Sequence, residues 1–207
     1  MRKPIDLETI TLARGSHTPD GIVCVMELAS QLANEDWSDS PKCASPVIAQ
    51  FLRSWNDALD DGPRQMLKPY ALKVIGTNTG AKDEDTRAWL VTDWLVRVQA
   101  PAWLQLAGIT AQAAALRGLP ALTSSEIATS VQSVLDGARR DGDAAGAAAR
   151  AAAGEKLAPT VTQLQASATE LVKRMCAVGE VAERPMIAVR LREVLAGVTE
   201  TCAAVSA

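Results

Sequence analysis

The sequence predicts an all-α protein, a helical bundle with a loop-rich N-terminal segment and a C-terminal αα-hairpin built from two long helices. Hydrophobic residues make up 48% of the chain, and many are Ala, Leu and Val, which suit helix-on-helix packing. In most segments the apolar residues recur at spacings of three and four, the period of an amphipathic helix. Sustained strand alternation is confined to the first few residues.

The N-terminal segment is expected to be irregular before its first helix. Residues 1–20 predict an irregular or short extended entry that ends in a turn rich in Gly, Pro and Asp. A short helix is predicted over residues 22–33, followed by a polar loop over residues 34–44. Ser45 and Pro46 then predict a helix start, because Ser can cap the N-terminus and Pro suits the first helical position. The buried stripe predicted for this helix is Val47, Ile48, Phe51, Leu52 and Trp55.

The middle of the chain predicts further helices separated by Gly and Pro. In the helix that begins at Pro46, Arg53, Asn56 and Asp57 are expected to lie away from the buried stripe. A helix is predicted over residues 65–75, kinked near Pro69, and a loop over residues 76–80. The next helix, which includes residues 89–98, is apolar nearly all round and is therefore expected at the centre of the bundle. Pro101 kinks or restarts that helix, and a short helix follows over residues 111–117.

A domain boundary is predicted near residues 119–122. It divides an N-terminal helical domain, residues 1–121, from an Ala-rich C-terminal helical region, residues 122–207. The second part opens with a capping box over Thr123 to Glu126 and continues into an Ala-rich stretch that favours helix. Two amphipathic helices, from Pro159 to Gly179 and from Pro185 onward, complete the predicted αα-hairpin.

Composition and charge limit the classes of function. A net charge of −3 gives no field for holding phosphate backbones, which disfavours nucleic-acid binding. Acidic residues interrupt the N-terminus, and nowhere do about 18 apolar residues follow one another, so neither a signal peptide nor a membrane span is expected. Four cysteines in 207 residues do not form the pattern of a secreted disulfide framework. The sequence therefore predicts a cytoplasmic protein.

The densest group of chemically competent side chains lies between residues 17 and 43. His17 is the only histidine, and Cys24 and Glu27 share one face of the first predicted helix. With Cys43 they could supply the four ligands of a tetrahedral zinc site. The spacing matches no zinc ribbon or finger. The alternative is that the two cysteines are small buried hydrophobic residues and that His17 is a surface residue.

Trp37 lies in the polar loop beside Asp36 and Asp39. An exposed Trp among acidic residues would suit the centre of a protein–protein contact. The alternative is that the ring folds back over the neighbouring helix.

Several short strings along the chain are distinctive. They are CVMELA at 24–29, WSD at 37–39, CASPV at 43–47, RSWND at 53–57, LKPY at 67–70, WLVR at 94–97, LAPT at 157–160 and LQASA at 164–168. In these strings the chain resembles a family of uncharacterised proteins of actinobacteria and their phages, which have an Ala-rich C-terminal part. The resemblance covers most of residues 15–120 and about residues 155–176, and it implies no known activity. A phage origin would favour a small host-modifying or regulatory protein.

Three hypotheses of function follow. The first is a non-enzymatic helical interaction protein that presents the loop around Trp37 to a protein partner, because no complete catalytic set is present. The second is a zinc-dependent enzyme or a structural zinc protein centred on His17, Cys24, Glu27 and Cys43. The third is a nucleic-acid binder, which the net charge disfavours. The predicted terminal helices could also pair between copies of the chain. The basic residues of the third hypothesis are Arg139, Arg140, Arg190 and Arg192.

Overall fold

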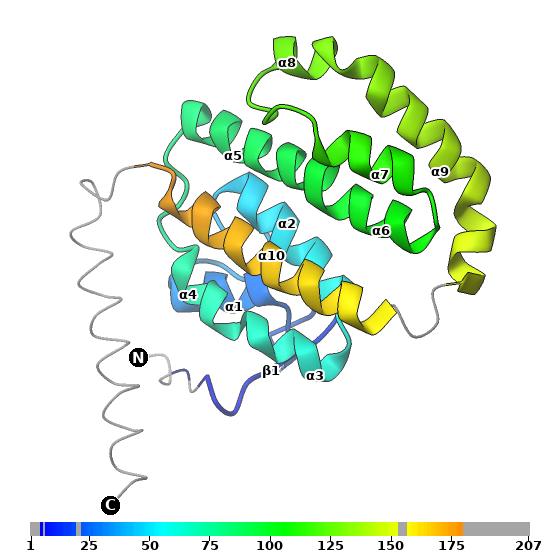
Figure 1. Cartoon of the computed structure of the whole chain (residues 1–207). Helices are drawn as coiled ribbons and strands as arrows, with labels where there is room; N and C mark the ends of the chain where they lie inside the picture. The colour runs from blue at the N-terminus through cyan, green and yellow to red at the C-terminus, as the bar shows by residue number, and fades with distance from the viewer. Residues whose placement is uncertain (1–4, 6, 20–21, 153–156, 180–207) are drawn as a thin grey trace, which may run out of the picture. The chain divides into compact units, whose positions relative to one another are not determined.

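The protein is mostly helical, as the sequence predicted (Figure 1). The computed structural model describes residues 5, 7–19, 22–152 and 157–179, and within α9 the side chains only up to residue 143. No helix in these ranges is long and apolar enough to cross a membrane. The predicted final helix from Pro185, and with it the αα-hairpin and the pairing of terminal helices between copies, lies outside the described residues.

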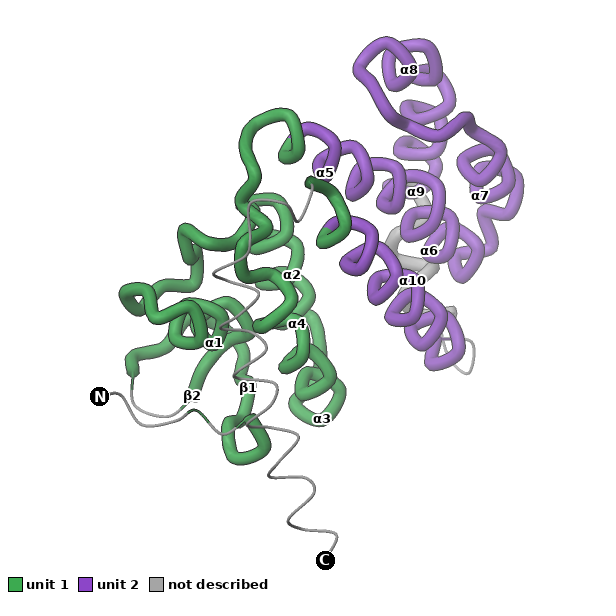
Figure 2. The backbone as a smooth tube through the Cα atoms, turned by 90° about the vertical axis from the view of Figure 1, so that its left-hand side faces the viewer, with its two compact units in different colours: residues 1–84, 176–207 green, residues 85–175 purple. Residues whose placement is uncertain are grey.

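The chain divides into two compact units (Figure 2). Unit 1 comprises residues 1–84 and 176–207, and unit 2 comprises residues 85–175. The predicted boundary at residues 121/122 falls inside unit 2. There Leu119 and Leu122 belong to one hydrophobic cluster with residues on both sides of them in sequence.

Unit 1 is built from short elements. Its strands and helices are β1 (Thr11–Leu12), β2 (Ile22–Val23), α1 (Val25–Leu32), α2 (Pro46–Ala58), α3 (Asp61–Arg64), η1 (Gln65–Leu67), α4 (Lys68–Lys73) and the first turn of α5 (Ala81–Trp94). The two strands are parallel, with Thr11 opposite Ile22 and Leu12 opposite Val23. α1 packs against α2 and α4. The helix predicted over residues 22–33 therefore begins three residues late, because residues 22–23 pair with a strand and Cys24 caps α1.

Helix α2 begins as predicted, with Ser45 as the N-cap and Pro46 in the first turn. Its buried face is rotated from the predicted stripe: Ile48, Leu52 and Asn56 are buried, whereas Phe51 and Trp55 are only half-buried. The prediction that Asn56 lies away from the core is wrong. Its side-chain amide donates to the Ala13 carbonyl at 2.8 Å, so the residue fastens the N-terminal segment to α2.

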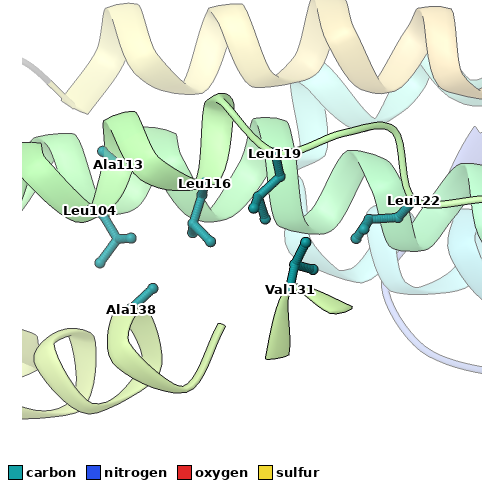
Figure 3. Packing of buried hydrophobic residues seen from close by; sticks show 7 residues of the cluster. All are labelled: Leu104, Ala113, Leu116, Leu119, Leu122, Val131 and Ala138. Atoms are coloured by element: carbon teal, nitrogen blue, oxygen red, sulfur yellow. The ribbon is translucent and has the colours of Figure 1, made fainter. Parts of the chain in front are cut away.

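Unit 2 contains longer and more regular helices. They are the remainder of α5, the π-helical turn η2 (Leu95–Gln99), α6 (Ala100–Leu106), α7 (Thr110–Arg117), α8 (Ser125–Ser130), α9 (Gln132–Ala152) and most of α10 (Leu157–Ala177). α6, α7 and α9 pack together around one hydrophobic cluster. Figure 3 shows Leu104 of α6 and Leu116 of α7 pointing toward the side on which Ala138 and Val131 lie. The cluster comprises Leu104, Ala113, Leu116, Leu119, Leu122, Val131 and Ala138.

The apolar segment of residues 89–98 is not a fully buried central helix. Leu95 and Val98 are 40% and 39% exposed, and Trp103 is 43% exposed. The π-helical turn gives a physical reason. Pro101 would clash with the carbonyl four residues earlier in an α-helix, and the wider turn, closed by Ala100 N–H donating to Leu95 O, relieves that clash. An inserted residue of this kind rotates the following side chains relative to the preceding ones, so the apolar pattern does not form one face.

Helix α10 ends where the sequence predicted, close to Gly179. Gly179 has φ +86°, and a Cβ at this position would lie 2.5 Å from the Asp83 carboxylate and 2.6 Å from Thr79 Oγ1. Only glycine fits both the backbone conformation and the space. Earlier in α10, Trp94 Nε1 of α5 donates to Ser167 Oγ at 3.0 Å and Arg87 Nε donates to Met175 O at 3.1 Å, which joins the two helices within unit 2.

Candidate functional site

The candidate site begins at the N-terminus of α1, where Glu27 closes a capping box. Cys24 is the N-cap, and its Sγ accepts a hydrogen bond from Glu27 N at 3.4 Å. In return Glu27 Oε2 accepts one from Cys24 N at 2.7 Å. Ser or Thr normally occupies the N-cap of such a box. Here the larger, less polar sulfur accepts the capping hydrogen bond, and Cys24 is buried, with 2% of its surface exposed.

Glu27 is 1% exposed, and its carboxylate holds the segment before β2. Oε1 accepts from His17 N at 2.7 Å, and Oε2 lies 3.0 Å from His17 Nδ1. A buried carboxylate is costly unless donors surround it, and these two bonds together with Cys24 N supply three. The only histidine of the chain is thus fixed against α1 by both its main chain and its ring.

Trp37 is connected to the same group of residues. Its indole Nε1 donates to His17 O at 2.8 Å, so the ring is half-buried rather than fully exposed. The neighbouring Ser38 N donates to Ser30 Oγ at 3.3 Å, and Ser30 Oγ donates to Glu27 O at 2.8 Å. The Glu27 network, defined as Glu27, His17, Cys24, Ser30 and Trp37, therefore joins three segments of unit 1.

The 34–44 loop is fastened along the rest of its length as well. Glu35 Oε2 accepts from Lys42 N at 2.6 Å, which closes the loop on itself. Arg53 of α2 donates through NH1 to Asp39 O and to Ser40 Oγ, both at 2.7 Å. Two side chains of this loop, Asp36 and Lys42, are exposed. The Asp39 side chain is 40% exposed, accepts from Ser40 Oγ at 3.0 Å and lies 4.0 Å from Arg53 Nε.

The C-terminal end of the loop is held by the segment that follows α4. Cys43 O accepts from Gly76 N at 2.8 Å and from Asn78 N at 3.3 Å. Asn78 Nδ2 also donates to Lys42 O at 2.9 Å. Because its main chain is fixed at both ends and in the middle, the 34–44 loop has a defined shape without a helix or a strand of its own.

The two cysteines near the loop are uncharged thiols at neutral pH. Burial raises the pKa of the Cys24 thiol to about 12, and the Glu27 carboxylate adds to the rise. Burial also raises the pKa of Cys43 to about 12, with a further contribution from the Glu35 carboxylate beside it. Since the thiolate is the form that attacks electrophiles and binds metals, neither residue is activated for such chemistry in this arrangement.

The four residues of the predicted zinc site do not form one group. His17, Cys24 and Glu27 are joined by hydrogen bonds, but Cys43 lies with Glu35 instead. In the part of the chain that the structure describes, no three or more His, Cys, Asp or Glu side chains are placed so that they could hold a metal ion. The carboxylate oxygens that a metal would need accept hydrogen bonds from His17 and Cys24.

The basic residues of the nucleic-acid hypothesis are placed only in part. Arg139 and Arg140 are exposed on α9, and Arg139 Nε lies 3.9 Å from Asp143 Oδ2. Arg190 and Arg192 lie outside the described residues. An exposed Arg beside an Asp one turn later is the usual pattern of a solvated helix surface.

Two residues that shape the site were not singled out by the sequence. Ser30 links Glu27 to Ser38, and Asn56 joins α2 to Ala13 and accepts from Val25 N at 3.4 Å. Both look like ordinary polar positions on an amphipathic helix. No sequence signal separates a polar residue that faces solvent from one that bonds a distant peptide group.

The chain matches no protein-family model, no curated protein and no solved structure.

Proposed function

We propose that this protein is a non-enzymatic helical interaction protein and that the 34–44 loop binds a protein partner. The observation that carries the proposal is the combination of a fixed main chain with exposed outward side chains. The loop is bonded to α1, to Arg53 and to the segment after α4, while Asp36 and Lys42 are exposed. A loop that is already ordered loses little conformational entropy when it binds.

Trp37 supplies the apolar part of the proposed contact. Its indole N–H is already bonded to His17 O, so a partner would not have to replace that hydrogen bond. The part of the ring that remains accessible can then be buried against an apolar pocket, as Trp commonly is at the centre of interfaces. The flanking Asp36 and Asp39 favour a partner surface with basic residues around that pocket.

The reactive groups of the region also support a binding role over catalysis. The Glu27 carboxylate accepts three hydrogen bonds, and the Cys24 thiol accepts the peptide N–H that it caps. Each of these groups therefore has a structural task that a general base or nucleophile would have to give up.

A crosslinking experiment tests the proposal. A photoreactive p-benzoylphenylalanine replaces Asp36 in one variant and the fully exposed Glu126 of unit 2 in a control variant, in cells that naturally express the chain. We expect a defined protein to be captured at position 36 and not at position 126. Binding of the purified partner should weaken about tenfold in Asp36→Lys and more in Trp37→Ala, and stay unchanged in Glu126→Lys.

Three outcomes would contradict the proposal. Capture of the same proteins at both positions would remove the loop as the binding surface. Unchanged affinity in Asp36→Lys and Trp37→Ala would do the same. Turnover of a metabolite or nucleotide by the purified protein would refute its non-enzymatic part. Capture of a second copy of the chain would identify the partner as the protein itself, and its oligomeric state should then depend on Asp36 and Trp37.

A further inference from the structure

Glu27 reaches the 34–44 loop by two separate routes. Through its side chain it holds His17, whose carbonyl accepts the Trp37 indole N–H. Through its main-chain carbonyl it accepts from Ser30 Oγ, which in turn accepts from Ser38 N. The two routes end on consecutive residues of the loop, so one buried residue on α1 is linked to both.

The bonds to His17 are not needed for capping α1. The capping box is complete with the pair of bonds between Glu27 and Cys24. The two further bonds, from His17 N and His17 Nδ1, add no hydrogen bond to the helix. Their effect is to fix the position of the His17 carbonyl, which accepts the hydrogen bond from the Trp37 indole N–H.

An indole carries a single N–H donor, so the orientation of a half-buried Trp depends strongly on where its acceptor lies. If His17 O moved, the Trp37 ring would have to rotate toward water or leave its donor without a partner. Either change would alter the part of the ring that the loop presents.

We propose that Glu27 is a positioning residue for Trp37 and acts on it through His17. This inference rests on the proposed function, because it assigns the residue that sets the shape of the proposed binding loop. A carboxylate fits this position because its two oxygens each accept from a peptide N–H, Oε1 from His17 N and Oε2 from Cys24 N. The amide of a glutamine offers only one acceptor oxygen, so its NH2 group would face one of these two donors.

Hydrogen exchange of the indole N–H groups in the free protein tests this inference. The five Trp indole signals are recorded by ¹⁵N NMR, and Trp37→Phe identifies the signal of Trp37. Trp94, whose indole N–H is bonded to Ser167 Oγ in unit 2, serves as the internal reference. Glu84→Gln is the matched control, because Glu84 is also a carboxylate at a helix N-terminus and accepts from Ser45 Oγ and Val47 N.

We expect exchange of the Trp37 indole to rise about tenfold or more in Glu27→Gln, while Trp94 keeps its rate. His17→Ala should give a smaller rise, because its main-chain N–H can still bond the carboxylate. Glu84→Gln should leave the Trp37 rate unchanged. Should Glu27→Gln not fold, the same comparison is made with His17→Ala alone.

An unchanged Trp37 rate in folded Glu27→Gln and His17→Ala would overturn the inference. An equal rise for Trp37 and Trp94 would do so too, because it would indicate general destabilisation. The readout requires no partner, so it is independent of the crosslinking test. A loop that fails to bind any protein but keeps the Glu27 dependence of Trp37 would refute the proposed function only.

Discussion

The two units of the chain differ in how many polar side chains they bury. Among the described residues, six of the seven buried polar or charged residues lie in unit 1, and only Arg87 lies in unit 2. Both units also bury hydrophobic residues, and in unit 2 one cluster of them lies between its helices. The six buried polar residues of unit 1 are Glu27, Ser30, Ser45, Asn56, Arg64 and Thr77.

The difference follows from how much of each unit is loop. A helix satisfies its own peptide groups, so the helices of unit 2 mainly need apolar contacts to pack. Unit 1 has short helices and long connections, whose buried peptide groups need partners from elsewhere. Gln65 shows how this is done: its side-chain amide donates to Leu12 O and accepts from Leu12 N, both at 2.9 Å, as a neighbouring strand would. The proposed binding loop is thus part of the unit whose loops are fixed by polar side chains.

The largest loss of stability is expected from a substitution in the hydrophobic cluster of unit 2. Leu116 is 3% exposed, and Leu116→Ala should lower the free energy of unfolding by about 3 kcal/mol, because the cavity adds to the lost burial. Leu95→Ala is the matched control in the same unit. Since Leu95 is 40% exposed, its loss should be below about 1 kcal/mol. Urea unfolding measures both, and equal losses would show that the cluster is not the main support of unit 2.

An intermediate effect is expected from a buried polar residue of unit 1. Arg64 is 3% exposed and donates to Asn56 O and Leu59 O, two carbonyls at the end of α2. Arg64→Met keeps an apolar stem but leaves both carbonyls without this donor, which should cost about 2 kcal/mol. Arg53→Met is the control, because its side chain is 24% exposed and water can replace it. Its expected loss is about 0.5 kcal/mol. If the two variants lose the same stability, burial does not determine the importance of these bonds.

The sequence predicted those features of the fold that depend on nearby residues. The start of α2 at Ser45 and Pro46 and the end of α10 near Gly179 are set by local capping chemistry, and both are present. The predicted capping box over Thr123 to Glu126 is displaced by one residue, because Ser124 rather than Thr123 caps α8 and accepts from Ile127 N. The pairing of Ile22 with Thr11 was missed because it depends on a contact between segments eleven residues apart. A short run such as residues 22–23 carries no periodicity that distinguishes the two states.

The candidate site was predicted in part for the same reason. The sequence brought His17, Cys24 and Glu27 into one neighbourhood, and they are joined by hydrogen bonds. Cys43 could not be placed, because its position depends on Gly76 and Asn78, which are more than thirty residues away. The acidic residues beside Trp37 suggested an exposed loop, but nothing in the sequence indicated that the indole is bonded to His17 O.

The smallest expected effect concerns the cysteines of unit 1, which contains Cys24, Cys43 and Cys176, the three cysteines among the described residues. Burial raises the pKa of Cys24 from 9.0 to about 12, so above pH 9 the unfolded chain releases this proton while the folded chain keeps it. Ionisation then favours the unfolded state. Stability is fully present well below pH 9 and should fall by about 1 kcal/mol between pH 9 and pH 10, since the unfolded thiol is half ionised at pH 9. Cys43 should add less, because it is only half-buried and water screens its charge.

Urea unfolding at pH 8, 9 and 10 checks this expectation, with Cys24→Ser as the control. Serine can still accept the Glu27 peptide hydrogen bond but does not titrate in this range. The loss of stability between pH 9 and pH 10 should therefore be smaller by about 1 kcal/mol in the variant. Identical slopes in the two proteins would mean that Cys24 is accessible to water, and the buried capping box would then not be the stable anchor on which the fixed loop of unit 1 depends.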